Sequence, residues 1–193
     1  MEAFETIQGE GFHTGRAAYF LRLAGCDVGC HWCDVKESWD ASQHPSLGTD
    51  TIISDMSHCP AEIVVVTGGE PLMHDLDILT QAIKSLNKQT HIETAGVYPI
   101  TGDWDWLCFS PKKFKPALAE YYDRADELKV VIYNQSDFKW AEEHASKMNA
   151  QSKLFLQPEW GKKDEMLPLI VDYIKQNPRW QVSLQTHKYM NIP

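Results

Sequence analysis

The stretch that decides the fold is Cys26-Asp27-Val28-Gly29-Cys30-His31-Trp32-Cys33, in which three cysteines fall within eight residues. Thiolates are soft ligands that favour zinc, copper(I) or iron–sulfur clusters. Structural zinc takes four ligands, and His31 is able to complete such a set, so a zinc site stays open as an alternative. The spacing Cys-x-x-x-Cys-x-x-Cys in one tight loop favours a [4Fe–4S] cluster held at three corners, with one iron left open for an external ligand.

Outward from this loop, short strand-like runs alternate with helical stretches. Such alternation predicts a mostly parallel α/β sheet with right-handed crossovers. The predicted helices cover residues 75–87, 137–149 and 164–175, and the predicted strands cover residues 17–23, 63–67, 91–94, 106–109, 128–132, 154–157 and 181–184.

Polar and glycine-rich segments follow most of these strands. Because the carboxyl ends of parallel strands meet at one edge of a sheet, ligands bind there, and the segments are expected to share a site. They are Cys26 with its loop, Gly68-Gly69-Glu70-Pro71, Glu93-Thr94-Ala95-Gly96, Ser110-Pro111-Lys112, Gln157-Pro158-Glu159 and Gln185-Thr186-His187.

Size and charge narrow the classes of function. The chain has 193 residues, 43% of them hydrophobic and 23% charged, which fits one domain over residues 1–193. The net charge of −9 without a basic cluster argues against a nucleic-acid partner. No apolar run approaches the ~18 residues of a membrane helix, and the first ten residues lack a signal peptide, so a cytoplasmic location without a membrane partner is expected.

The cysteine loop, together with Thr67-Gly68-Gly69-Glu70-Pro71 after the second predicted strand, resembles the radical S-adenosylmethionine superfamily. That resemblance implies one [4Fe–4S] cluster per chain on Cys26, Cys30 and Cys33, whose open iron binds the amine and carboxylate of S-adenosylmethionine. An electron from the cluster then cleaves the cofactor to a 5′-deoxyadenosyl radical, which takes a hydrogen atom from the substrate.

Both ends of the chain carry a narrower resemblance. The segments 5–11, Gly15-Arg16, 20–26 and 184–193 are similar to those of the 7-carboxy-7-deazaguanine synthases. The family converts 6-carboxy-5,6,7,8-tetrahydropterin to 7-carboxy-7-deazaguanine with loss of ammonia, a carbon–nitrogen lyase reaction of the 7-deazapurine (queuosine-type) pathway. The resemblance implies a pared-down partial (β/α) barrel of six or seven strands, a homodimer and an external one-electron donor such as flavodoxin.

Residue roles follow from the same resemblance. The cofactor is expected to contact residues that come mainly from the loops after the strands: Trp32, Asp34, Gly68, Gly69, Glu70, Glu93, Ser110, Pro111, Lys112, Gln157, Pro158, Glu159 and Trp160. The pterin is expected to contact residues from the two ends of the chain and from two strands: Ile7, Gln8, Gly9, Arg22, Thr67, His187 and Pro193. Arg22 is suited to a two-pronged contact with the substrate carboxylate.

One position departs from the family pattern. The family commonly places a threonine two residues after the third cysteine, where its hydroxyl binds Mg²⁺, and this chain has Val35 there. Mg²⁺ requires oxygen ligands but readily keeps waters. Weak binding through substrate and water alone, or no binding, is therefore expected.

Two rival functions remain open at this stage. Another radical enzyme of the superfamily, such as an activase that installs a glycyl radical on a partner protein, would share the cluster motif. A non-enzymatic zinc or redox-sensing protein would use the same thiolates for a different purpose.

Overall fold

The computed structural model describes residues 2–193. All strands join one eight-stranded sheet in chain order. β1 pairs antiparallel with β2, and every later pair is parallel. The strands are β1 (Glu2–Ile7), β2 (Ala17–Leu23), β3 (Ile63–Gly68), β4 (Gln89–Thr94), β5 (Trp106–Phe109), β6 (Glu127–Ile132), β7 (Lys153–Pro158) and β8 (Trp180–Val182).

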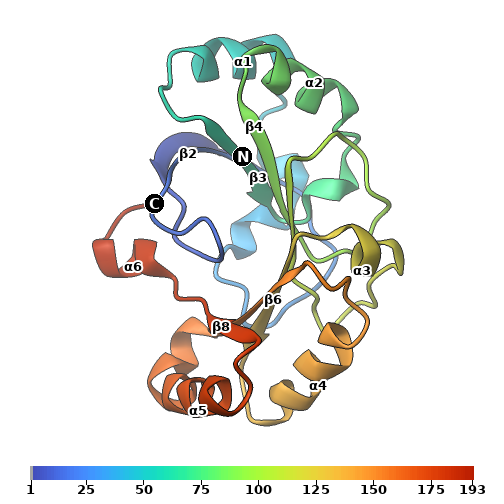
Figure 1. Ribbon diagram of the computed structural model, residues 1–193. Coiled ribbons are helices and arrows are strands. Elements are labelled where there is room, and N and C mark those ends of the chain that lie inside the picture. The colour runs from blue at the N-terminus through green and yellow to red at the C-terminus, as the bar shows by residue number, and fades with distance from the viewer. Residues whose placement is uncertain (1) are drawn as a thin grey trace.

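The sheet curves around a central space with helices on its outer face (Figure 1). α1 and α2 lie over one half of the sheet, and α4 and α5 lie over the other. This is the partial (β/α) barrel that the family resemblance implied, and its mostly parallel strands were predicted from the strand–helix alternation. The helices are α1 (Thr49–Ser57), α2 (Asp77–Ser85), α3 (Glu120–Arg124), α4 (Ser136–Ala145), α5 (Lys163–Gln176) and α6 (Thr186–Met190).

Alternation along the strands separates the apolar core from the site. In β6, Leu128, Val130 and Ile132 are fully buried in the main hydrophobic cluster, together with Met166 and Ile170 of α5. The intervening residues of β6 point to the other face of the sheet, the barrel interior, because side chains alternate along a strand. Packing against the helices thus fixes which residues of each strand face inward.

The loop between β1 and β2 covers one end of the barrel. The ring of His13 lies 4.5 Å from that of His91 in β4 and 4.6 Å from that of Trp106. The backbone N–H of Phe12 donates to the buried carboxylate of Glu127 at 3.1 Å.

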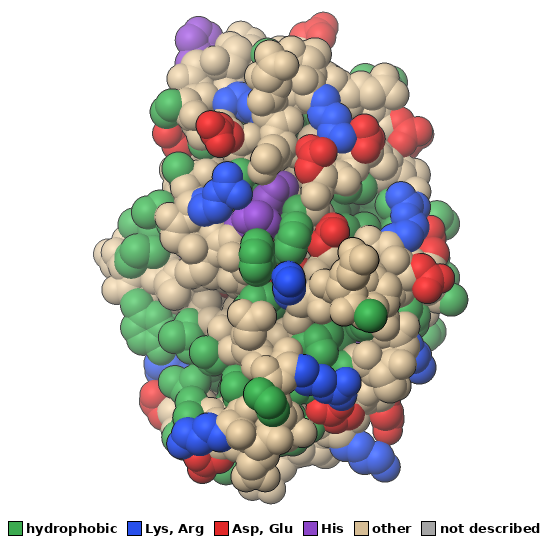
Figure 2. All heavy atoms as spheres, in the orientation of Figure 1, with side chains coloured by type: hydrophobic (Ala, Val, Ile, Leu, Met, Phe, Trp, Pro, Cys, Tyr) green, Lys and Arg blue, Asp and Glu red, His purple; other side chains and the backbone are tan. Residues whose placement is uncertain are grey.

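Figure 2 shows a histidine near the middle of one face with hydrophobic side chains beside it, and acidic and basic side chains interspersed around them.

All seven predicted strands are present, and the structure adds an eighth. β1 was not predicted because its sequence, Glu-Ala-Phe-Glu-Thr-Ile, is polar and half exposed. Its strand character comes from pairing with the edge of β2, where Phe4 stacks on Phe20 at 5.7 Å. Helices α1, α3 and α6 were also not predicted: α3 and α6 have five residues each, and α1 buries only Met56. Within residues 2–193 no helix has the length and apolar content needed to cross a membrane.

Candidate active site

A cavity of about 260 Å³ opens at the carboxyl ends of the strands. Every residue predicted to touch the cluster, cofactor or substrate lines it except Pro111, which is buried beside it. The structure therefore gathers segments that span the chain from residue 7 to residue 193. It also adds residues outside the predicted site segments: Phe4, Glu10, Phe20, Ser38, Trp39, Lys129 and Val131.

The cysteine loop begins three residues after β2 and is anchored on both sides. Cys30 is buried and packs in a small apolar cluster with Val28 and Ala95. Asp27 accepts hydrogen bonds from Tyr98 Oη and Lys115 Nζ, each at 2.7 Å. These contacts hold the loop against the segment that follows β4, so its thiols face the cavity.

The three thiols fit a cubane cluster with one open iron. Cys26, Cys30 and Cys33 are free, come from one loop and line one cavity. Each would bind a separate iron, so they need not converge on a point. Across residues 2–193 no three His, Cys, Asp or Glu side chains are placed to bind a single metal ion. Burial raises the pKa of the Cys30 thiol to about 11, so cluster binding is coupled to proton release.

Glycine at position 69 is required by a close approach of two loops. A Cβ there would lie 2.3 Å from the carbonyl oxygen of Gly25, next to Cys26. The N–H of Gly69 donates to Leu23 O at 2.9 Å, and that of Glu70 donates to Gly25 O at 2.8 Å. The loop after β3 therefore packs directly on the start of the cysteine loop. A side chain at position 69 would prevent this close approach.

The Glu70 carboxylate holds this loop in place through hydrogen bonds. It accepts hydrogen bonds from Thr94 Oγ1 at 2.6 Å, Ala95 N at 2.8 Å and Leu72 N at 3.2 Å. Burial raises its pKa, while these hydrogen bonds and the charge of Lys112 act in the opposite direction. Its protein donors tie the loop after β3 to the end of β4.

Lys112 brings a positive charge beside the cysteines. Its ammonium donates to Ser110 O at 2.7 Å and Ser110 Oγ at 2.6 Å, and lies 5.8 Å from the centre of the Trp32 ring. Burial lowers the pKa of Lys112 below its ordinary value, and the neighbouring Cys30 offsets part of this shift. A cation in this position suits a cofactor that carries a carboxylate.

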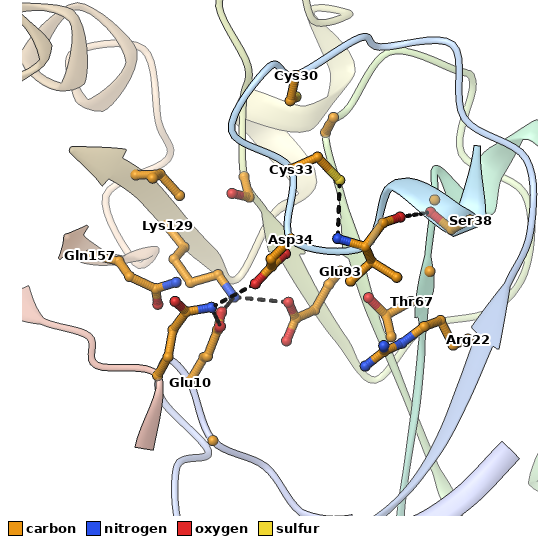
Figure 3. A pocket seen from close by; sticks show the side chains of 18 of the residues that line it. Glu10, Arg22, Cys30, Cys33, Asp34, Ser38, Thr67, Glu93, Lys129 and Gln157 are labelled. Atoms are coloured by element: carbon orange, nitrogen blue, oxygen red, sulfur yellow. Dashed lines mark hydrogen bonds and ion pairs between the residues drawn. The ribbon is translucent and has the colours of Figure 1, made fainter. Parts of the chain in front are cut away.

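On another side of the cavity, Arg22 and Thr67 are register partners on β2 and β3 and lie side by side (Figure 3). The Arg22 guanidinium is half-buried, pairs with Glu2 at 3.0 Å and stands over the Phe4 ring at 5.6 Å. The Arg22 charge is therefore held beside an apolar wall. A carboxylate bound there would form a strong charge-assisted hydrogen bond with the guanidinium.

Position 35 offers no oxygen from its side chain. The Val35 side chain lines the cavity, its N–H points to Cys33 Sγ at 3.4 Å, and its carbonyl accepts from Ser38 Oγ at 2.6 Å. The nearby Ser38 hydroxyl donates its hydrogen to this carbonyl. Position 35 therefore lacks the hydroxyl that the family pattern supplies to Mg²⁺.

A buried ionic network, which the sequence analysis missed, forms the floor of the cavity (Figure 3). Lys129 Nζ lies 2.5 Å from Glu10 Oε2 and 2.8 Å from Glu93 Oε2. Gln8 Nε2 donates to Glu93 Oε1 at 3.0 Å, and Gln185 Nε2 donates to Glu10 Oε1 at 2.9 Å. The available signal was a lysine between the apolar residues Leu128 and Val130 of β6.

The charges of this network stabilise one another. Burial would raise the pKa of Glu10, but the charge and hydrogen bond of Lys129 outweigh it and lower that pKa to about 2. Burial would likewise lower the pKa of Lys129, and the charges of Glu10 and Glu93 raise it well above its ordinary value. At neutral pH the lysine is therefore protonated and Glu10 is ionised.

The last residues form a strap over the cavity. Thr186 donates from N and Oγ1 to Gly9 O, both at 2.9 Å, and a Cβ on Gly9 would lie 2.3 Å from His187 Nδ1. The carbonyl of Pro193 accepts from Thr6 Oγ1 at 3.2 Å. Residues 6–9 and 186–193 thus lie together.

Comparison with known proteins agrees with this geometry. The family model described as a 4Fe-4S single cluster domain matches residues 7–132. The 7-carboxy-7-deazaguanine synthase of Flavobacterium psychrophilum is 62% identical over all of this chain and 91% of its own length. That of Synechocystis is 44% identical over 99% of this chain and 91% of its own. The crystal structure of QueE from Escherichia coli superposes with a TM-score of 0.86 at 28% identity, covering 95% of this chain and 91% of that one.

The partial barrel and the three-cysteine loop define an iron–sulfur protein with a single 4Fe-4S cluster, of the radical S-adenosylmethionine type. Within that class, the chain belongs to the 7-carboxy-7-deazaguanine synthase family. This membership separates it from the glycyl-radical activases and from zinc or redox-sensing proteins.

Proposed function

We propose that this chain converts 6-carboxy-5,6,7,8-tetrahydropterin to 7-carboxy-7-deazaguanine with loss of ammonia. One observation carries the proposal beyond family membership: a single cavity joins the cysteine loop to a half-buried arginine and a ring of hydrogen-bonding side chains. Figure 3 shows Cys30 and Cys33 above the cavity, Arg22 and Thr67 on one side, and Glu10, Glu93 and Lys129 below. The donor set suits a cluster, and the remaining walls suit a flat, polar acid.

Cys26, Cys30 and Cys33 hold the cluster, which together with S-adenosylmethionine supplies the radical that starts the reaction. The backbone of Gly68 and Gly69 and the side chains around Ser110, Lys112 and Trp32 line the space beside the cysteines, where the cofactor would be held. Residues Gln157 to Trp160, at the end of β7, line the same cavity.

Arg22 binds the substrate carboxylate, and Thr67 beside it adds a hydroxyl. Gln8, Gly9, His187 and the acidic floor of the cavity read the edges of the pterin ring. The floor and the strap bring these groups together from both ends of the chain. Together they orient the substrate for hydrogen transfer, which is the main contribution of a protein to this kind of reaction.

The strap helps to exclude water from the reaction. In α6, the ring of Tyr189 packs edge-on against that of Trp160 at 5.3 Å, and Lys188 Nζ lies 5.0 Å from the centre of the Trp160 ring. These contacts cover the cavity next to the end of β7. A covered site protects a reactive intermediate from side reactions.

Several finer points belong to the same proposal. Val35 leaves Mg²⁺ without a protein ligand, so we infer turnover without a required Mg²⁺. A one-electron donor such as flavodoxin would reduce the cluster, and a homodimer is expected from the family resemblance. The five free cysteines fit a reducing compartment, which favours the cytoplasm.

An anaerobic turnover assay tests the function. Reconstituted protein receives S-adenosylmethionine, a strong reductant and 6-carboxytetrahydropterin, and products are followed by mass spectrometry. Formation of 7-carboxy-7-deazaguanine, and its loss in Cys30→Ala, supports the proposal. Formation of 5′-deoxyadenosine without that product would retain the radical chemistry and reject the substrate.

A further inference from the structure

Lys129 is a charged side chain in a place where charge is costly. It lies in the middle of β6 with its side chain 3% exposed, facing the barrel interior. Isolated ions are rarely buried unless they are paired. Its ammonium bridges two carboxylates, Glu10 from the segment after β1 and Glu93 from β4, which are themselves mostly buried. The lysine therefore joins three separate parts of the cavity floor.

The two carboxylates still have free acceptor capacity. An ionised carboxylate has about four acceptor positions on its two oxygens. Glu10 accepts from Lys129, Gln185 and Gln157, and Glu93 accepts from Lys129 and Gln8. Each retains room for further donors, and both line the cavity. A ligand edge that carries N–H groups matches them, whereas an edge of carbonyl oxygens does not.

We propose that Lys129 is a positioning residue that holds Glu10 and Glu93 as a fixed pair of ionised acceptors, and that this pair selects the pterin edge bearing the 2-amino group and its neighbouring ring N–H. The inference rests on the proposed pterin substrate and assigns its orientation: the amino edge faces the floor of the cavity. The lysine itself acts through the two glutamates and needs no contact with substrate.

Removal of the lysine would leave two like charges facing one another. Two carboxylates that share a site without a cation cannot both stay ionised at neutral pH, so one takes up a proton. A protonated carboxyl presents a donor to the substrate N–H groups and binds them poorly. The other titratable groups near the pair lie inside the barrel, on the strap and around the cysteine loop: Glu127, Cys108, His13, His91, His187, Lys188, Asp34 and Lys112.

The test uses Lys129→Met in the reconstituted, cluster-loaded protein and measures binding rather than turnover. The probe is 6-carboxypterin, an unreactive aromatic analogue whose fluorescence reports binding, and Kd is measured between about pH 5.5 and about pH 7.5. We expect the ratio of variant to wild-type Kd to rise by about tenfold or more toward the acidic end. Taking the ratio at each pH cancels any titration of the probe itself.

Two further variants keep the test decisive. Lys113→Met also removes the lysine partner of a buried carboxylate, that of Asp137, but this pair lies outside the cavity. The ratio of its Kd to the wild-type Kd should therefore stay near one at every pH. Glu10→Gln retains the Lys129–Glu93 ion pair and removes the like-charge clash, so binding should weaken by a constant factor without pH dependence. It therefore serves as the deciding variant if Lys129→Met does not fold.

A second probe reports selectivity directly. In 6-carboxylumazine an oxo group replaces the 2-amino group, and wild type should bind it at least about tenfold more weakly than 6-carboxypterin because buried acceptors are left without donors. Both Lys129→Met and Glu10→Gln should lose most of this preference. Wild-type affinity and preference in both variants would overturn the role of Lys129. Failure of wild type itself to bind 6-carboxypterin would instead reject the pterin substrate.

Discussion

Lys188 Nζ lies 2.6 Å from Asp34 Oδ2, which joins the last helix of the chain to the residue directly after the third cysteine. Burial would raise the pKa of the Asp34 carboxyl, but the hydrogen bond and charge of Lys188 lower it below its ordinary value. Gln185 bridges this pair to the cavity floor, since its amide contacts both Asp34 and Glu10. The cysteine loop, the strap and the acidic floor are therefore parts of one connected network.

Lys188→Ala should loosen the strap without unfolding the protein. The Asp34 side chain is only partly buried, with 54% of it exposed, and such pairs contribute at most about 1 kcal/mol to global stability. The thermal midpoint should therefore change little, while amide hydrogen exchange of residues 186–193 becomes faster. Lys175→Ala, which breaks a more exposed surface pair with Asp172 at 3.1 Å, is the control and should leave the strap unchanged. Unaltered exchange in Lys188→Ala would show that other contacts hold the strap.

Arg22→Ala should weaken use of the carboxylated substrate by roughly 10²-fold or more in kcat/KM, because a charge-assisted contact worth about 3 kcal/mol is lost. Glu2 competes for the same guanidinium, so Glu2→Gln should leave KM unchanged or lower it. Steady-state kinetics measure both variants. An equal loss with a pterin that lacks the 6-carboxylate would place the effect of Arg22 elsewhere.

Cys30→Ala should abolish cluster assembly, whereas Cys59→Ala should not. Cys59 is buried in the main apolar core, far from the cavity lining, and its replacement by the smaller alanine should cost only stability. Iron and acid-labile sulfide, measured after anaerobic reconstitution, separate the two outcomes. A full complement of iron in Cys30→Ala would contradict the assignment of this residue as a ligand.

Turnover should be insensitive to removal of Mg²⁺. Val35 supplies no side-chain oxygen where the family commonly places a threonine, so the usual protein ligand to Mg²⁺ is missing at this position. We expect treatment with a chelator to change kcat/KM by less than about twofold, since Mg²⁺ bound only through substrate and water is readily lost. Val35→Thr restores a hydroxyl and is the informative partner variant. A large loss on chelation of the wild type would show that substrate and water suffice to hold the ion.

His91 should make the protein sensitive to acid. Burial lowers its pKa from 6.5 to about 3, and the positive charge of Arg16 and the neighbouring His13 act in the same direction. Between these two values the unfolded chain binds a proton at His91 and the folded protein does not, so the free energy of unfolding decreases as the pH falls. The expected slope from this residue is about 1.4 kcal/mol per pH unit.

Denaturant unfolding at several pH values, with wild type and His91→Gln compared, isolates this contribution. The comparison is needed because His144 also has a pKa lowered by burial, to about 4. The difference in stability between the two proteins should shrink toward acidic pH. A difference that is constant with pH would mean that His91 is not kept neutral by its surroundings.

Local sequence patterns determined the cluster loop and most of the sheet. Three thiolates within eight residues restrict the metal chemistry whatever the fold, and the strands from 17–23 to 181–184 could be predicted because their apolar runs pack under helices. The edge at which the site lies also followed, since parallel strands bring their carboxyl ends together. β1 could not be predicted, because its pairing with β2, and not its own composition, makes it a strand.

Only the tertiary structure decided which charges meet inside the barrel. Lys129, Glu10 and Glu93 are separated by dozens of residues, and no periodicity relates them. Their association depends on the curvature of the sheet, which turns alternate residues of β4 and β6 inward, and on the segment after β1, which closes over them. Burial then makes the pairing strong, because water no longer screens the charges. The sequence by itself therefore determined the cofactor chemistry, and the fold decided how the cavity holds a substrate.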